Sequence, residues 1–450
     1  MHGHEPVSAR LSDHASPRLS IHAALSPAPV KFSMLNNRLW IWLGAIIFVI
    51  VLPLIFKQSF AISLLCQMGI NIIFALSYNM LLGQTGMLSF GHAVYFGLGA
   101  FFSIHALSMI GAGTLHYPVT LLPIIGGVVG IVFGILFGYV TTKRSGTPFA
   151  MISMGIGELV FACSLMFPAF FGGEQGISAN RVAGGKWLGF ISYGPQIQVY
   201  YLIALWALIS AALMYAFTQT PLGRIANAVR DNSERAQFVG YNPQRVRFFV
   251  LAIASGFAGI AGALSAINYE IVTAENVSVQ ASGSVLLMTF IGGVGSFYGP
   301  IIGAVLVTFL QVALSGYTKA WLLYFGLFFL LMVMYAPGGI ASLIEMHRPT
   351  WKAKLASRLI PSYSIAAVPL LIALAGLVGL VEIIYYLETQ AGSGSAMKLA
   401  GFSFDAAKPT PWLICAALLI AGFLLSRYAF TGVRASWDSV SKELMSKERP

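Results

Sequence analysis

Apolar runs separated by short polar segments dominate the chain. A helical membrane crossing needs about 20 predominantly apolar residues. We expect helical spans at about 39–56, 60–82, 88–108, 117–141, 147–171, 198–217, 248–268, 282–293, 297–315, 319–337, 363–386 and 410–426. The run at 282–293 is short for a full crossing, and it predicts a half-helix or part of a broken span. The predicted fold class is all-α, a polytopic helical membrane protein with about ten core spans, some of them broken or half helices, and two extra C-terminal spans.

Composition supports this prediction. Hydrophobic residues make up 57% of the chain and charged residues 9%, whereas a soluble domain has roughly 45–50% and 25%. The formal net charge of +11 does not indicate nucleic-acid binding, because Lys and Arg accumulate in the cytoplasmic loops of membrane proteins. The three cysteines all lie in apolar runs, so we interpret them as buried thiols rather than a disulfide framework.

The charge distribution predicts the orientation and the domains. Residues 1–36 are polar and predict a disordered cytoplasmic tail, whose histidines match no metal-ligand spacing. Residues 37–345 form the main transmembrane domain, and residues 346–450 form an extension with two spans. Twelve spans threaded from a cytoplasmic N-terminus place the basic segments on the cytoplasmic side, together with the C-terminus. These segments are 142–146, 218–247, 338–362 and the C-terminal tail. Arg181 and Lys186 fall in an outer loop and weaken the contrast.

The segment 218–247, hereafter the knob, carries five arginines between two uncharged spans. Thr220 before a proline predicts a helix start, and Asp231 with Glu234 predicts a capping box for a second helix. Gly240 suits the C-terminal end of that helix. Two short helices joined by a turn would form a rigid element that docks a partner. The alternative is a solvated turn that carries the inward positive charge.

A family resemblance sharpens this prediction. Glu234, Ala236 and Gly240 have the Glu-x-Ala-x-x-x-Gly spacing, which resembles the coupling motif of ABC importer permeases. The knob resembles the inner-membrane permeases of branched-chain amino acid ABC importers. Three further segments resemble these permeases in order and spacing, namely "NIIFALSYNMLLGQTGMLSFGHAVYFGLGAF" (71–101), "PFAMISMGIGELV" (148–160) and "LLMTFIGGVGSFYGPIIGAVL" (286–306). The resemblance covers about residues 40–345 and leaves roughly the last hundred residues unmatched.

The resemblance implies a set of partners. These are ABC ATPase subunits, a second homologous permease and a soluble substrate-binding protein, in a bacterial inner membrane. It implies no cofactor and no covalent chemistry. The sequence holds no G-x-x-x-x-G-K-[ST] phosphate loop, so we expect the ATPase to be a separate chain. The coupling candidates on the knob are Arg224, Arg230, Asp231, Glu234, Ala236 and Gly240.

Polar residues within the apolar runs are candidates for the substrate path. Two readings stay open for them, path lining and interhelical hydrogen bonds. Glycines around residues 83–91 predict a helix break whose free backbone groups line a polar cavity, or close helix packing. The candidates between the second and third spans are Asn71, Asn79, Gln84, Ser89 and His92.

Glu158 has no other charged residue within ten positions on either side. An ionised carboxylate in an apolar span is costly unless it is paired, hydrated or protonated. Glu158 would therefore line the path and meet a substrate ammonium group, pair with a neighbouring span, or lie nearer the interface than drawn.

The predicted function is the path-forming permease subunit of an ATP-driven importer of branched-chain or other apolar amino acids. Urea or short amides are alternative substrates. An ion-coupled secondary transporter is the rival mechanism, and it would need several coupled intramembrane acids but no docking knob. A passive channel is the third possibility.

Overall fold

The computed structural model describes residues 32–183, 192–390, 396–399 and 402–448. The chain divides into two compact units, residues 1–52 and 53–450. The first unit holds most of α1 (Phe32–Ile55). Of the predicted tail, residues 1–31 lie outside the described residues. Residues 32–36, at the end of the predicted tail, belong to α1.

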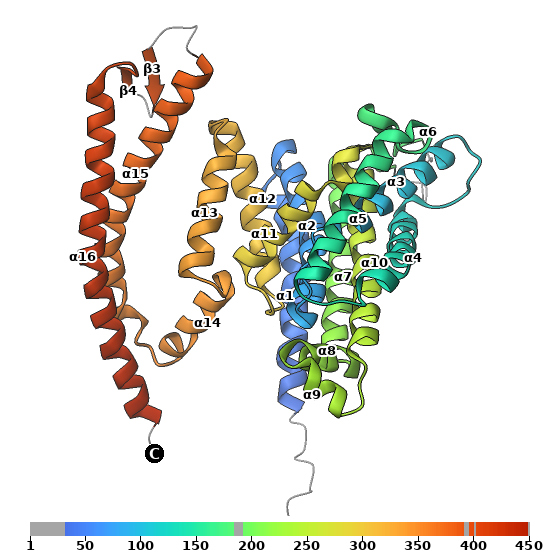
Figure 1. The fold of residues 1–450 in the computed structure, drawn as a ribbon, viewed down its shortest axis with the longest axis horizontal. Coiled ribbons are helices and arrows are strands. Elements are labelled where there is room, and N and C mark those ends of the chain that lie inside the picture. The colour runs from blue at the N-terminus through green and yellow to red at the C-terminus, as the bar shows by residue number, and fades with distance from the viewer. Residues whose placement is uncertain (1–31, 184–191, 391–395, 400–401, 449–450) are drawn as a thin grey trace, which may run out of the picture. The chain divides into compact units, whose positions relative to one another are not determined.

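The second unit is nearly all helix (Figure 1). Its long helices are α2 (Ser59–Thr85), α3 (His92–Gly111), α4 (Leu122–Thr141), α5 (Thr147–Met166), α7 (Gln196–Gln219), α10 (Pro243–Tyr269), α12 (Gly299–Tyr317), α15 (Ile360–Gln390) and α16 (Pro409–Glu448). Its shorter helices are α6 (Pro168–Phe171), α8 (Pro221–Asp231), α9 (Ser233–Phe238), α11 (Val279–Gly292), α13 (Trp321–Tyr335) and α14 (Gly339–Lys352). The 3-10 turns are η2 (Val119–Leu121), η3 (Gly173–Gln175), η4 (Ala274–Val277) and η5 (Ala356–Arg358).

Each predicted span corresponds to a helix. Among the described residues, nine helices are long and apolar enough to cross a membrane, or ten if α13 and α14, bent by 45°, count as one span. Trp40–Ile55 and Val279–Gly292 are shorter apolar segments. The protein is therefore an all-α, multi-pass membrane protein, as predicted. The 14 residues of α11 span roughly 21 Å, which fits the half-helix predicted at 282–293.

The core is built around α10, which packs against α2, α3 and α4. Glycines bring the backbones together, since a Cβ added at Gly259 would lie 2.0 Å from the Gly126 oxygen. A Cβ added at Gly262 would lie 1.9 Å from the oxygen of Phe96. Small residues allow such close helix contacts where lipid offers no hydrophobic driving force. The glycines of α10 therefore fix the arrangement of the central helices.

Two small antiparallel pairings complete the described fold. β1 (Ile177–Ser178) pairs with β2 (Ile271–Val272), and β3 (Ala396–Leu399) pairs with β4 (Phe402–Asp405). Beside the first pair, Arg181 is 8% exposed. Its guanidinium donates hydrogen bonds to the carbonyls of Tyr193, Gly194, Ile267 and Asn268 and to the Gln196 side chain. Arg181 therefore stabilises the C-terminal end of α10 through these hydrogen bonds, and it is not a free loop charge.

The C-terminal extension is a hairpin of α15 and α16. Gly376 and Gly422 sit at its helix contacts, where an added Cβ would lie 2.4 Å from the backbone of Leu419 and of Ala373. Tyr324 of α13 donates a 2.9 Å hydrogen bond to Glu382 of α15. The proposed domain boundary at residue 345 falls inside α14, so the extension begins without a break in the helix.

Candidate functional site

The two helices of the knob form, but their caps differ in part from the prediction. Thr220 caps α8, and its hydroxyl accepts a hydrogen bond from the Gly223 N–H at 3.2 Å. The second cap is Asn232, whose Oδ1 accepts from the Arg235 N–H at 2.9 Å. The capping box predicted for Asp231 and Glu234 is therefore wrong. Asp231 ends α8, and the next residue, an equally good cap, starts α9.

Gly240 ends α9 as predicted. Its φ of +92° lies in the region that favours glycine. The Gly240 N–H donates to the Gln237 carbonyl at 2.8 Å, and the Tyr241 N–H donates to the Ala236 carbonyl at 3.1 Å. These two bonds make a Schellman motif. An added Cβ would meet nothing within 4 Å, so a side chain here is opposed by backbone strain alone.

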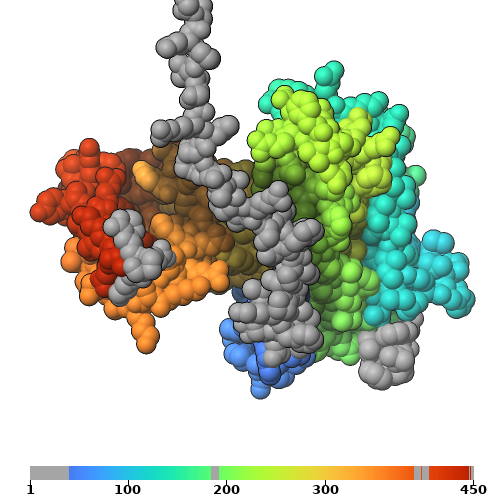
Figure 2. Space-filling view, turned by 90° about the horizontal axis from the view of Figure 1, so that it is seen from below, coloured from blue at the N-terminus to red at the C-terminus, as the bar shows by residue number. Residues whose placement is uncertain are grey.

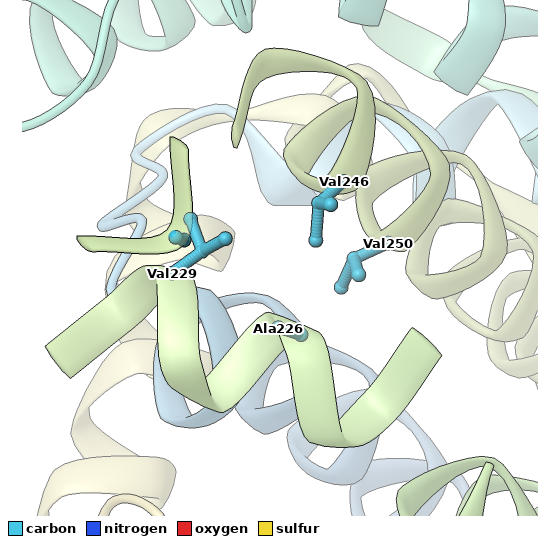
Figure 3. Packing of buried hydrophobic residues seen from close by; sticks show 5 residues of the cluster. Ala226, Val229, Val246 and Val250 are labelled. Carbon is cyan, nitrogen blue, oxygen red and sulfur yellow. The ribbon is translucent and has the colours of Figure 1, made fainter. Parts of the chain in front are cut away.

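A small hydrophobic core makes the knob rigid. Ala226 and Val229 of α8 pack with Val246 and Val250 of α10 (Figure 3), and Ala236 of α9 joins the same cluster. Ala236 is 6% exposed. Within the motif noted in the sequence, the alanine is thus a packing residue and the glycine a helix terminator, whereas Glu234 is exposed. Of the three, Glu234 presents an exposed side chain to a partner.

The end of α9 presents an apolar tip that the sequence prediction missed. Phe238 is 91% exposed and Val239 is 71% exposed. In the view from below, the yellow-green atoms around the knob form part of the surface that faces the viewer (Figure 2). The available signal was two adjacent apolar residues just before Gly240 in an otherwise charged segment. The two adjacent side chains make this tip a candidate contact site for another molecule.

Arg230 connects the knob to the membrane helices. Its Nη1 donates a hydrogen bond to the Gly83 carbonyl near the end of α2, and its Nε contacts Asp231 at 2.9 Å. A Cβ added at Gly295, in the turn between α11 and α12, would lie 3.5 Å from Nη1. Arg230 therefore lies against the last turn of helix α2 and the turn at Gly295, which are far apart in the sequence.

Asn79, one turn before Gly83 on α2, bonds α2 to the turn between α11 and α12. Its Nδ2 donates to the Ser296 carbonyl at 3.0 Å, and its Oδ1 accepts from the Gly295 N–H at 3.0 Å. A Cβ added at Gly83 would lie 2.9 Å from the Gly295 nitrogen. The end of α2, the turn before α12 and the knob thus form one bonded junction, through which a displacement of the knob would act on two membrane helices.

If the knob docks a partner, as the sequence predicts, we expect Arg230→Gln to lower transport without releasing that partner. The change removes a charged hydrogen bond to the Gly83 carbonyl, and such bonds are worth about 1.5–3 kcal/mol. The measurement is substrate uptake per unit of this protein in vesicles, together with recovery of the ATPase that the sequence predicts as its partner. Arg235→Gln removes the same charge from an exposed position of the knob. If both variants transport equally well, the junction does not transmit motion.

The other path candidates do not converge on one site. Asn71 donates to the Thr308 hydroxyl of α12 at 2.8 Å. The Ser89 carbonyl accepts from the Tyr78 hydroxyl at 3.0 Å. Gln84 is 8% exposed, and its Oε1 has no hydrogen-bond partner among the described residues. These contacts favour the interhelical reading for Asn71 and Asn79.

His92 starts α3 inside the core and is fully buried. The Ser77 hydroxyl donates to the Phe74 carbonyl at 2.7 Å, so the 3.0 Å contact between Ser77 and His92 assigns the proton to Nε2. The ring packs against Phe74, Tyr78 and Tyr95. Residues 86–91 before it are non-helical, so the helix break predicted there is present and His92 is a packing residue at its end.

Glu158 is the path candidate that faces outward. It lies on α5, is exposed, and forms no hydrogen bond or ion pair with any described residue. Gly155, one turn earlier, is also open, because an added Cβ would meet nothing within 4 Å. A carboxylate on an otherwise apolar helix face is costly unless a neighbour from another chain, water or a proton compensates its charge.

Comparison with known proteins identifies the family. Residues 60–337 match the model of the branched-chain amino acid transport system permease component. The chain is 28% identical over 305 residues to the high-affinity branched-chain amino acid permease LivM of Salmonella typhimurium, covering 63% of this chain and 70% of that protein. It is 26% identical over 339 residues to the probable LivM of Methanocaldococcus jannaschii, covering 65% and 96%.

More distant relatives include a sugar importer. The galactose/methyl galactoside import permease MglC of Haemophilus influenzae is 28% identical over 278 residues, covering 56% of this chain and 78% of that protein. No solved structure matches the chain. The family match spans the knob, Gly83 and Gly295, but it ends before the α15–α16 hairpin. The chain belongs to the branched-chain amino acid transport system permease family.

Proposed function

We propose that the chain forms the translocation path of an ATP-driven importer for branched-chain or other apolar amino acids. The observation that carries this proposal is the knob. Its apolar tip is exposed, its interior is packed, and Arg230 bonds it to the junction of two membrane helices. A solvated loop would need none of these features. The likeness to LivM permeases supports the substrate class.

The ATPase would dock on the knob as a separate chain. Glu234, Arg224 and the residues at the tip would contact it, while Ala236 and Gly240 hold the shape of the knob. ATP binding closes an ATPase dimer, and the knob would move with it. Arg230 would then displace the turns at Gly83 and Gly295, and the helices would re-pack to open the path to the other side.

The further partners follow from the same proposal. A second homologous permease would complete the path, and a soluble binding protein would deliver the substrate at the opposite face. The protein would sit in the bacterial inner membrane with the knob and both termini in the cytoplasm, as the basic segments favour. A second permease seated against α5 would supply the polar surroundings that Glu158 lacks among the described residues.

Glu158 would then line the path and meet the ammonium group of the substrate. We expect Glu158→Gln to reduce leucine uptake by at least about tenfold, because a charged hydrogen bond is lost. Membrane level and ATPase assembly should hold. The measurement is uptake at sub-saturating leucine, with isoleucine, urea and galactose as competitors. Isoleucine alone should compete.

The exposed acid Glu275 provides the matched control, and Glu275→Gln should transport normally. Normal leucine uptake by Glu158→Gln would remove the path role and leave Glu158 as a structural group. Competition by urea in place of isoleucine would overturn the proposed substrate class, because urea carries no ammonium group for Glu158 to meet. It would not overturn the permease function.

A further inference from the structure

Two buried polar atoms lie without partners at one end of α4 and α10. The Nε of Arg247 is buried and has no hydrogen-bond partner among the described residues. The hydroxyl of Thr141 has none either, and this side chain is 1% exposed. The neighbouring Thr142 shows the usual alternative, because its hydroxyl donates to the Gly138 carbonyl at 2.7 Å. Unpaired buried polar groups are costly, so these two atoms are candidates for contact with a ligand from outside the chain.

Helix packing places the two atoms at the same level. A Cβ added at Gly138 would lie 3.1 Å from Leu251, and one added at Gly134 would lie 3.2 Å from the Cα of Ala252. The two helices therefore run antiparallel at this contact. Thr141 follows Gly138 by one turn on the same face of α4, and Arg247 precedes Leu251 by one turn on the same face of α10. The hydroxyl and the guanidinium thus face the same space between the helices.

The surroundings of this space are basic on one side and apolar on the other. Lys143 and Arg144 follow α4 directly and are exposed. Just before them, Leu136 is 58% exposed and Val140 is 54% exposed. An acyl chain would lie along these apolar side chains while its headgroup reached the basic end.

We propose that Arg247 and Thr141, with Lys143 and Arg144, bind the phosphate of an anionic phospholipid headgroup. The guanidinium donates to phosphate oxygens, which suit its planar set of donors, and the threonine hydroxyl donates a further hydrogen bond. A docked acidic protein is less well matched, because Arg247 lies on α10 within one turn of its contact with α4, whereas the exposed tip of the knob lies at the end of α9. The proposal does not depend on which substrate the permease moves.

The test uses the full chain purified with the subunits that accompany it and then stripped of lipid. Native mass spectrometry would measure binding of phosphatidylglycerol, of zwitterionic phosphatidylcholine and of inorganic phosphate. We expect a clear preference for phosphatidylglycerol, and Arg247→Gln should weaken its binding about fivefold, the effect of one basic residue near an anionic headgroup. Lys442→Gln removes one exposed charge from α16 and should leave the binding unchanged.

Thr141→Val keeps the test decisive if Arg247→Gln does not fold. It replaces an unpaired buried hydroxyl by a methyl group, so the Tm should not fall, while phosphatidylglycerol binding should weaken. Unchanged binding in Thr141→Val, or equal binding in Arg247→Gln and Lys442→Gln, would overturn the proposal. Arg247-dependent binding of inorganic phosphate alone would keep the anion site but exclude a lipid as its source. Loss of the ATPase from Arg247→Gln with unchanged lipid binding would assign the site to a protein partner instead.

Discussion

Phe238→Asp should abolish ATP-driven uptake while leaving the permease folded. Phe238 is 91% exposed at the end of α9, so its replacement removes no core contact. If the tip inserts into a pocket of the ATPase, an aspartate there buries a charge in place of an aromatic anchor. Anchor residues of this kind commonly contribute 2 kcal/mol or more to binding, so we expect ATPase recovery to fall at least about tenfold. The measurement is co-purification of the ATPase, followed by uptake in vesicles.

Tyr317 provides a matched control, because it is also 91% exposed but lies at the end of α12, away from the knob. Tyr317→Asp should retain both the ATPase and uptake. Full ATPase recovery by Phe238→Asp would show that the tip does not dock, and the knob would then be a solvated turn.

Gly262→Val should reduce accumulation of the folded permease several-fold. An added Cβ at this position would lie 1.9 Å from the Phe96 carbonyl oxygen, and α10 is the central helix of the core. Overpacking costs about 1–3 kcal/mol when neighbours can shift. Here the neighbour is backbone, and α3 itself must move. We expect a several-fold loss of monodisperse protein after detergent extraction.

Gly432→Val separates this clash from the other effects of replacing a helical glycine by valine, which by itself raises the helix propensity. Gly432 lies in α16, and an added Cβ there would meet nothing within 4 Å. This variant should accumulate normally. Equal recovery of both variants would contradict the close packing between α3 and α10.

The membrane helices could be predicted from the sequence because length and hydrophobicity largely determine them. Each predicted apolar run corresponds to a helix, including the short α11. Local detail was less accessible. Asp231 and Asn232 are both good helix caps, and only the packing of α8 decides that the second is used. The run at 147–171 breaks at Phe167, because a proline follows at position 168.

The candidate site was predicted only in part, because contacts between distant segments are not visible in a single sequence. Arg230 was selected for its charge, yet its bond to the Gly83 carbonyl depends on how α8 packs under α2. Phe238 was missed because exposure cannot be predicted from composition. His92 was selected for its polarity, but three aromatic rings enclose it. Arg181 was predicted to be an outer-loop charge, but its guanidinium donates hydrogen bonds to five acceptors.

We expect this permease to be driven by ATP through a docked subunit. The most direct measurement is leucine uptake by proteoliposomes that contain the permease with its ATPase and partner permease, with the binding protein outside. We predict uptake that requires enclosed ATP, persists when a protonophore collapses the proton gradient, and is lost with Phe238→Asp. Uptake that continues without ATP and follows an imposed proton or sodium gradient would contradict the account and favour a secondary transporter.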